Sequence, residues 1–170
     1  MQRLTASQEA MVATWKRHTY AEFVLKDANA SLATMTPQPQ VFLVPTGTGG
    51  SGRAGVHAFY TDSFLPNVPP DFELLPLSQT LGENRLIEEF VIRFTHSIEM
   101  GWMLPDLGPT GRRVEVAFVG IIEFDGGKIA AERLYWDQAT VLSQLGIRNH
   151  PMMCAGAASA AQLLRLRSGR

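Results

Sequence analysis

The spacing of apolar residues predicts helices in the first part of the chain and strands in the second. Met11 and Trp15 fall on one side of a helix over about 7–24. An alanine-rich stretch and an aromatic stretch predict two further helices, and a β-branched run between them predicts a short strand. These helices span about 27–35 and 53–64, and the strand spans 40–44.

Long runs of strand-forming residues, separated by short turns, dominate the second part. Asp125-Gly126-Gly127 predicts a tight hairpin. Helices followed by a meander of antiparallel strands predict an α+β fold, in which a curved sheet wraps around the N-terminal helices as a cone. Such a cone encloses an apolar cavity that is open at one end. The predicted strands are 72–81, 85–96, 112–124 and 128–136, and the helices that follow them are 138–145 and 155–166.

Size and composition predict one globular domain over residues 1–170 and argue against several classes of function. Hydrophobic residues make up 45% of the chain and charged residues 18%, a balance typical of a folded core. The net charge of −1 gives no electrostatic footprint for nucleic acid or an anionic membrane, and no apolar run reaches membrane-spanning length. The N-terminus is unlike a signal peptide and Cys154 is the one cysteine, so we expect a soluble, cytoplasmic protein.

Asp137 lies where the last strand is predicted to run into a helix. A carboxylate at the mouth or floor of a cavity has a raised pKa when it is poorly solvated, and it then transfers protons near neutral pH. An aspartate directly before a helix also acts as an N-cap, which stabilises the helix by roughly 1 kcal/mol. The sequence leaves both interpretations open, and one residue can serve both.

Alternation along the strands predicts which side chains line the cavity. Phe90, Phe94 and His96 share one face of their strand, so we expect the two phenylalanines in the cavity wall and His96 near its rim. Tyr135 shares a face with Arg133 in the last strand, and we expect Tyr135 in the same wall.

The first predicted helix carries a second group of candidates. His18 and Glu22 are four residues apart and share a face, and Trp15 lies close to them on the helix. The pair is either a surface interaction worth a few tenths of a kcal/mol or a polar group that points into the cone. We expect all three residues to bind substrate. Trp102, in an apolar loop cluster, is expected to cover the cavity or to form a dimer contact.

Three other motifs do not predict a site. His96 and Glu99 spell His-x-x-Glu, but no second histidine is close in sequence, and we predict no metal. Residues 47–52 match G-x-G-x-x-G, but no βαβ unit follows, so we predict no dinucleotide site. Cys154 has only His150 nearby, which is weak evidence for a thiol enzyme.

Several motifs together resemble the SnoaL-like branch of the NTF2-like superfamily. The chain is more specifically similar to NTF2-like domains associated with dienelactone hydrolase-type (carboxymethylenebutenolidase-related) proteins, and this similarity extends over nearly all of it. The motifs that carry the resemblance are Gly127-Lys128-Ile129, Tyr135-Trp136-Asp137-Gln138-Ala139, 141–146, 18–23, 46–50, Phe59-Tyr60, 94–96, 102–105 and 109–112.

The resemblance implies a cone that is often dimeric through the outer face of its sheet. It also implies a role for Asp137, because the matching aspartate of the polyketide cyclases in this branch is the acid/base of an intramolecular aldol closure. Close relatives are expected to carry histidines where this chain has Leu43 and Arg133. An arginine beside Asp137 would keep the carboxylate ionised, which suits a base or an anion-binding pair.

We therefore expect one of two functions. The first is a cofactor-independent cyclase, isomerase or hydrolase for a small hydrophobic carbonyl compound, polyketide- or lactone-like. In it, Asp137 takes a proton from the carbon beside the carbonyl, and His96, Tyr135 or Arg133 stabilises the oxyanion. The second is a non-catalytic module that binds a small ligand or mediates dimerisation. In both cases we expect a homodimer that binds a small hydrophobic molecule and needs no cofactor.

Overall fold

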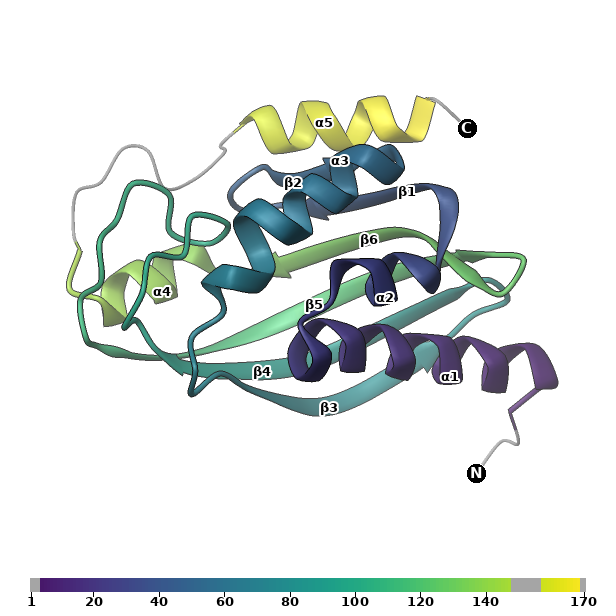
Figure 1. Ribbon diagram of the computed structural model, residues 1–170, viewed down its shortest axis with the longest axis horizontal. Helices are drawn as coiled ribbons and strands as arrows, with labels where there is room; N and C mark the ends of the chain where they lie inside the picture. Colours follow the sequence, from purple (N-terminus) through teal and green to yellow (C-terminus); the bar gives the residue numbers. More distant parts are fainter. Residues whose placement is uncertain (1–3, 148–156, 169–170) are drawn as a thin grey trace.

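The computed structural model describes residues 4–147 and 157–168, whose strands form one curved six-stranded sheet (Figure 1). The strand order is β2-β1-β6-β5-β4-β3. Neighbouring strands are antiparallel except for β1 and β6, which run parallel. The strands are β1 Met35–Leu43, β2 Thr48–Ser51, β3 Glu73–Leu81, β4 Arg85–Thr95, β5 Arg113–Asp125 and β6 Lys128–Trp136.

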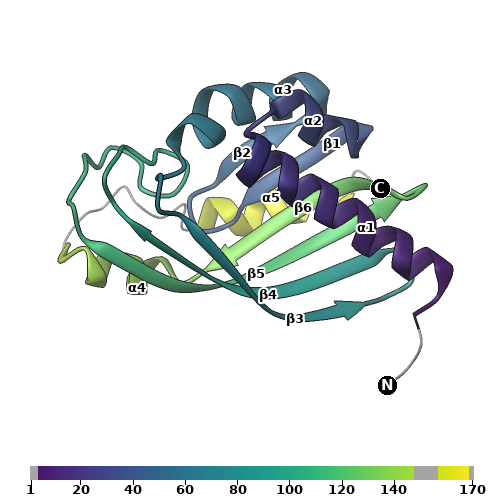
Figure 2. The same cartoon turned by 60° about the horizontal axis from the view of Figure 1, so that its bottom comes forward.

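Two helices continue as π-helical turns. Helix α1 (Ala6–Tyr20) runs into η1 (Ala21–Leu25), and α3 (Gly52–Ala58) runs into η2 (Phe59–Phe64). Figure 2 shows α1, α2 and α3 over one face of the sheet. None of the described helices is long and apolar enough to cross a membrane. The other helices are α2 Ala28–Ala33, the 3-10 turn η3 Leu65–Asn67, α4 Gln138–Gln144 and α5 Ala157–Ser168.

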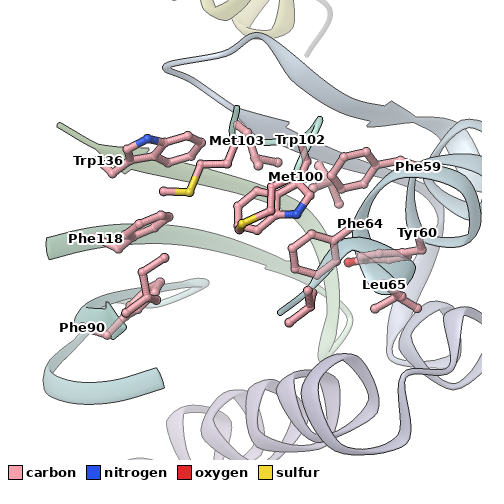
Figure 3. Packing of buried hydrophobic residues seen from close by; sticks show 14 of the residues in the cluster. Phe59, Tyr60, Phe64, Leu65, Phe90, Met100, Trp102, Met103, Phe118 and Trp136 are labelled. Carbon is pink, nitrogen blue, oxygen red and sulfur yellow. The ribbon is translucent and has the colours of Figure 1, made fainter. Parts of the chain in front are cut away.

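Alternation along the strands buries the face of the sheet that the helices cover. On β4, Phe90 and Phe94 are buried, whereas Glu89, directly before Phe90, is exposed on the other face. Trp102, from the loop between β4 and β5, packs against Phe64 of η2 with ring centroids 5.1 Å apart. Figure 3 shows this tryptophan between the rings of η2 and those of the sheet. The core therefore joins η2, the loop and the strands.

The architecture confirms the predicted α+β fold and its curved sheet, but the sequence prediction failed at one edge. The residues between the helix predicted over 27–35 and the strand predicted over 40–44 belong to β1, which starts at Met35. The glycine-rich motif over 47–52 contains β2, a strand that was not predicted. Gly49 has a φ of +135° and lies against the backbone of Val41, and a Cβ on Gly50 would collide with the carbonyl of Gly55. The glycines let β2 pack closely between β1 and α3, so their motif is structural.

Helix α5 lies beside the β1–β2 ribbon (Figure 1). The hydroxyl of Ser159 donates a hydrogen bond to the carbonyl oxygen of Val44, which ties the helix to the end of β1. The start predicted for this helix, together with Cys154 and His150, lies outside the described residues.

Candidate functional site

An aromatic cavity lies between η1, η2 and the buried face of the sheet. It encloses about 520 Å³ when the space at its open end is included, but only about 30 Å³ can hold the centre of a water molecule. The smaller volume is the better measure of the room for a ligand, because the larger one counts all space between the atoms and part of the open solvent. A ligand larger than water must therefore displace some rings. The aromatic lining residues are Trp15, Phe23, Phe59, Tyr60, Phe64, Phe72, Phe90, Trp102 and Phe118.

Two buried carboxylates, from Glu22 and Glu132, lie in the wall of this cavity. The Nε2 atom of His18 lies 3.2 Å from Oε1 of Glu22 and 3.5 Å from Oε2 of Glu132. The hydroxyl oxygen of Tyr60 lies 3.1 Å from the same nitrogen. We call these four residues the acid–histidine cluster. His18 itself is fully buried and does not line the cavity, so it contacts the two carboxylates from behind.

Local structure fixes the orientation of His18. The hydroxyl of Thr34 donates to the carbonyl oxygen of Ser31 (2.6 Å), so its oxygen accepts a hydrogen bond from Nδ1 of His18 at 2.7 Å. The Nδ1 atom is therefore a donor, and Nε2 points at the carboxylates. Glu22 reaches His18 from the next helical turn, and Glu132 reaches it from β6, where it pairs with Ile122 of β5.

Burial and charge shift the protonation of the acid–histidine cluster. Burial alone would lower the pKa of His18, but the nearby Glu22 and Glu132 carboxylates outweigh it and raise that pKa to about 10. Burial, followed by the charge of Glu22, raises the pKa of Glu132. Burial likewise raises the pKa of Tyr60 well above its usual value. The cluster thus combines a cationic histidine with a carboxylate that holds its proton more strongly than usual.

A third buried carboxylate supports the cluster from β4. Oε2 of Glu88 accepts a hydrogen bond from the indole Nε1 of Trp15 at 2.7 Å, and its Oε1 accepts one from Gln79 at 2.7 Å. The indole of Trp15 in turn stacks on the imidazole of His18, with centroids 5.6 Å apart and an interplanar angle of 18°. Glu88 therefore orients an aromatic ring that contacts both the cavity and the cationic histidine.

Three residues of the cluster carry groups that also ligate metals. Single ligand atoms of His18, Glu22 and Glu132 lie within 4.8 Å of one another, so these described residues could hold a divalent cation. A histidine must be deprotonated at the nitrogen that binds a metal. The carboxylates favour a proton on His18, and this proton occupies the position that a cation would take. A divalent cation bound there would therefore have to displace this proton.

Four residues predicted to bind substrate meet at the cavity. Trp15, Glu22, Phe90 and Trp102 lie in its wall, and His18 contacts it through the carboxylates. Of the two interpretations of the helix pair, the structure therefore supports the polar group that points into the cone.

Asp137 does not line the cavity. It is exposed at the start of α4, where its carboxylate accepts hydrogen bonds from the amides of Ala139 and Thr140 at 2.9 and 3.2 Å. Hydrogen bonds from the hydroxyl and the amide of Thr140 lower its pKa. These contacts are those of an N-cap, so of the two interpretations of Asp137 the structure supports the cap.

The prediction of which face of β6 lines the cavity is also wrong. Glu132 and Leu134 point into the cavity, which places Arg133 and Tyr135 on the opposite face. Arg133 forms an ion pair with Glu123 at 2.5 Å instead of lying beside Asp137.

His96 and Phe94 face the core but lie away from the cavity lining. Nδ1 of His96 accepts a hydrogen bond from the amide of Thr110 at 3.3 Å, and its Nε2 has no hydrogen-bond partner among the described residues. Burial lowers the pKa of His96. Neither side chain therefore sits where the sequence placed it, at the rim or in the wall of the cavity.

Sequence reasoning missed Glu132 and Tyr60. Glu132 shares its strand face with Leu134 and Trp136, and two large apolar neighbours are a signal that this face points inward. Tyr60 lies in the predicted helix over 53–64, but no local pattern relates it to His18, which is 42 residues away in sequence.

The comparisons with known proteins come from sequence and from structure. The sequence model of the family described as SnoaL-like polyketide cyclase matches residues 17–145. No curated protein sequence gives a significant match. Residues 17–145 include all members of the acid–histidine cluster as well as Asp137.

Solved structures share the fold at low sequence identity. A protein of Jannaschia sp. CCS1, assigned to the SnoaL-like polyketide cyclases, has 16% identity and a TM-score of 0.71, covering 88% of this chain and 100% of its own. An NTF2-like protein of Burkholderia pseudomallei K96243 has 19% identity and a TM-score of 0.62, covering 80% and 97%. IdmH of Streptomyces antibioticus, assigned as a polyketide cyclase, has 23% identity and a TM-score of 0.61, covering 81% and 99%. These matches establish an NTF2-like fold, as the resemblance predicted.

Proposed function

Because the chain belongs to the SnoaL-like polyketide cyclase family, we propose that it is a cofactor-independent acid–base enzyme for a small hydrophobic carbonyl compound. One observation carries the proposal: the carboxylates of Glu22 and Glu132 are buried in the wall of an aromatic cavity. A carboxylate with a raised pKa in an apolar site can accept and return a proton near neutral pH. The polyketide- or lactone-like substrate class rests on the resemblance of the sequence.

We assign the proton transfer to Glu132. Its Oε2 makes no hydrogen bond to another described side chain, and it lines the cavity. In the proposed reaction, Glu132 takes a proton from the carbon beside the carbonyl of the bound substrate. The hydroxyl of Tyr60, which lies in the cavity wall, then stabilises the enolate oxygen. Return of the proton at another carbon gives an isomerase, and attack of the enolate on a second carbonyl gives a cyclase.

This assignment moves the proton carrier from Asp137, at the start of α4, to Glu132, in the cavity wall. Asp137 is exposed, and its hydrogen bonds stabilise the carboxylate form. Glu22, at 3.2 Å from His18, has a different role from Glu132, because it helps to keep the histidine protonated. The two buried carboxylates therefore divide into a proton carrier and a charge partner.

The second candidate function is a non-catalytic module that binds a small ligand. The capping contacts of Asp137 favour it, because they give this aspartate a structural role. Such a module would bind hydrophobic ketones or lactones without exchanging their protons. Binding and proton exchange therefore have to be measured in the same samples.

Deuterium exchange at the carbon beside a carbonyl tests the proposal. We expect the wild-type protein to accelerate exchange of 1-tetralone and γ-phenyl-γ-butyrolactone in D₂O, followed by proton NMR. Glu132→Gln should lower the accelerated rate by roughly 100-fold or more, the usual scale of general acid–base catalysis. Asp137→Asn should leave the rate unchanged, because asparagine is also a good N-cap.

Two results would contradict the assignment. Loss of exchange in Asp137→Asn, together with full exchange in Glu132→Gln, would return the proton transfer to Asp137. Binding of both compounds by the wild-type protein, without any acceleration of exchange, would make the ligand-binding module the better account.

A further inference from the structure

The charge that faces the cavity is negative. Among the described lining residues, Glu22 and Glu132 carry ionisable acids, and no lysine, arginine or histidine is present. His18 offsets part of this charge from behind the carboxylates, but it is fully buried and does not reach the cavity. An anionic ligand would meet two carboxylates there without a facing cation, which is costly in an apolar site.

The other lining groups suit a positive charge. Nine of the lining side chains are aromatic, and the face of an aromatic ring attracts cations through its quadrupole. Oε2 of Glu132 is a buried acceptor without a hydrogen bond in the described structure, and its nearest ion-pair partner is His18 at 3.5 Å. A buried carboxylate oxygen without a donor is strongly stabilised by a cation placed against it.

We propose that the cavity takes a ligand with a compact ammonium head and rejects carboxylates and phosphates. The inference concerns the cavity of the proposed enzyme and rests on the proposed function, because it adds the charge of the substrate to its carbonyl chemistry. The ammonium head lies against the aromatic rings and Glu132, and the remainder of the ligand extends toward the half-buried Phe23 and Phe72.

Binding of such a cation is coupled to a proton. The charged and titratable groups that face Glu132 are His18 from α1, Glu22 from η1, Tyr60 from η2 and Glu88 from β4. A cation beside Glu132 favours its ionised form. The ligand therefore releases a proton from the carboxylate when it binds, in the pH range where part of Glu132 is protonated.

Three probes of nearly equal shape test the charge preference. Choline carries a trimethylammonium head, 3,3-dimethylbutan-1-ol is its neutral analogue, and 3,3-dimethylbutanoate is an anion of similar size. Isothermal titration calorimetry should show choline binding at least about tenfold more tightly than the neutral alcohol, the scale of a desolvated cation–π contact. The anion should bind more weakly than the alcohol. Repeated in buffers of different ionisation enthalpy, the choline titration should show proton release.

Matched variants locate the effect. Glu132→Gln keeps the shape of the side chain and should reduce the preference for choline to about threefold or less. Glu22→Gln provides a second test should the first variant fail to fold. Glu89→Gln is the control, because Glu89 lies on the exposed face of the same strand as Glu88, and it should retain the full preference.

These experiments distinguish a failure of the ammonium-ligand proposal from a failure of the proposed proton transfer. Equal affinity for choline and the alcohol, tightest binding of the anion, or no binding of any probe to the wild-type protein would overturn the ammonium ligand. If 1-tetralone still exchanged its protons in that case, the proposed proton transfer would stand. A preference for choline without any proton exchange would support the ammonium ligand and contradict the proposed enzymatic activity.

Discussion

At the scale of single residues, His18 controls how stability depends on pH. Its pKa in the folded protein, about 10, lies above the ordinary value of 6.5. The protonated form is therefore bound more tightly in the folded state, and this stabilisation is complete below about pH 6.5 and lost as the pH rises toward 10. The raised pKa of Glu132 acts in the same direction, because its protonated form is also favoured by folding.

We expect the free energy of unfolding of the wild-type protein to fall between pH 7 and pH 10, by roughly 4 kcal/mol at most. Urea denaturation at a series of pH values would measure it. His18→Gln should flatten this decline, whereas His57→Gln, in the half-buried part of α3, should leave it unchanged. A wild-type protein whose stability stays constant over this range would contradict the protonation assigned to His18.

The sequence could predict only part of this cluster. The four-residue spacing places His18 and Glu22 on one face, because that relation is set within a single helix. Whether the face meets solvent or the cavity depends on Thr34, Tyr60 and Glu132, which reach His18 from other elements. Contacts of this kind come from tertiary packing, and no local pattern encodes them.

At the scale of elements, the face of β6 decides which residues form the site. A change of one position exchanges every inward side chain for an outward one. The prediction that Tyr135 points inward therefore placed Glu132 on the outer face of the strand. The bounds of β6 were nevertheless predicted correctly as 128–136. The β1–β2 ribbon was missed for another reason. Proline and glycine are depleted in most strands, but β1 contains two prolines, and the glycines of β2 allow close packing at the edge of the sheet.

The glycine-rich ribbon provides a second test. Gly50→Ala should destabilise the protein by about 1–3 kcal/mol, because the added Cβ would collide with the backbone carbonyl of Gly55. Thermal denaturation would measure the change. Gly108→Ala is the control, because no atom lies within 4 Å of a Cβ there. Equal stability of the two variants would show that the ribbon tolerates side chains.

At the scale of the whole molecule, the outer face of the sheet is incompletely covered. Ile87, Val91 and Ile121 are half-buried on it, and Val119 is 38% exposed. Helix α5 lies beside the β1–β2 ribbon, and these apolar side chains of β4 and β5 remain partly exposed. An apolar sheet face of this kind is suited to a second copy of the chain.

We expect a homodimer through this face. Sedimentation at micromolar concentration should give about twice the chain mass of 18.7 kDa. Val119→Glu should shift the protein toward the monomer, because it places a charge in the apolar contact. Val24→Glu changes an equally apolar, 62% exposed residue on η1 and should leave the dimer intact. A wild-type monomer would rule the assembly out.

The parallel pairing of β1 with β6 has a consequence for biosynthesis. Gln40 lies opposite Ala131, so about ninety residues must be translated after β1 before its partner exists. At roughly 5–20 residues per second, this takes about 5–20 seconds. During that time β1 has only β2 beside it, and the nascent chain exposes an unpaired strand edge and the aromatic rings of the unfinished cavity. Glu132 joins His18 and Glu22 only after this delay, so the acid–histidine cluster is among the last parts of the fold to assemble.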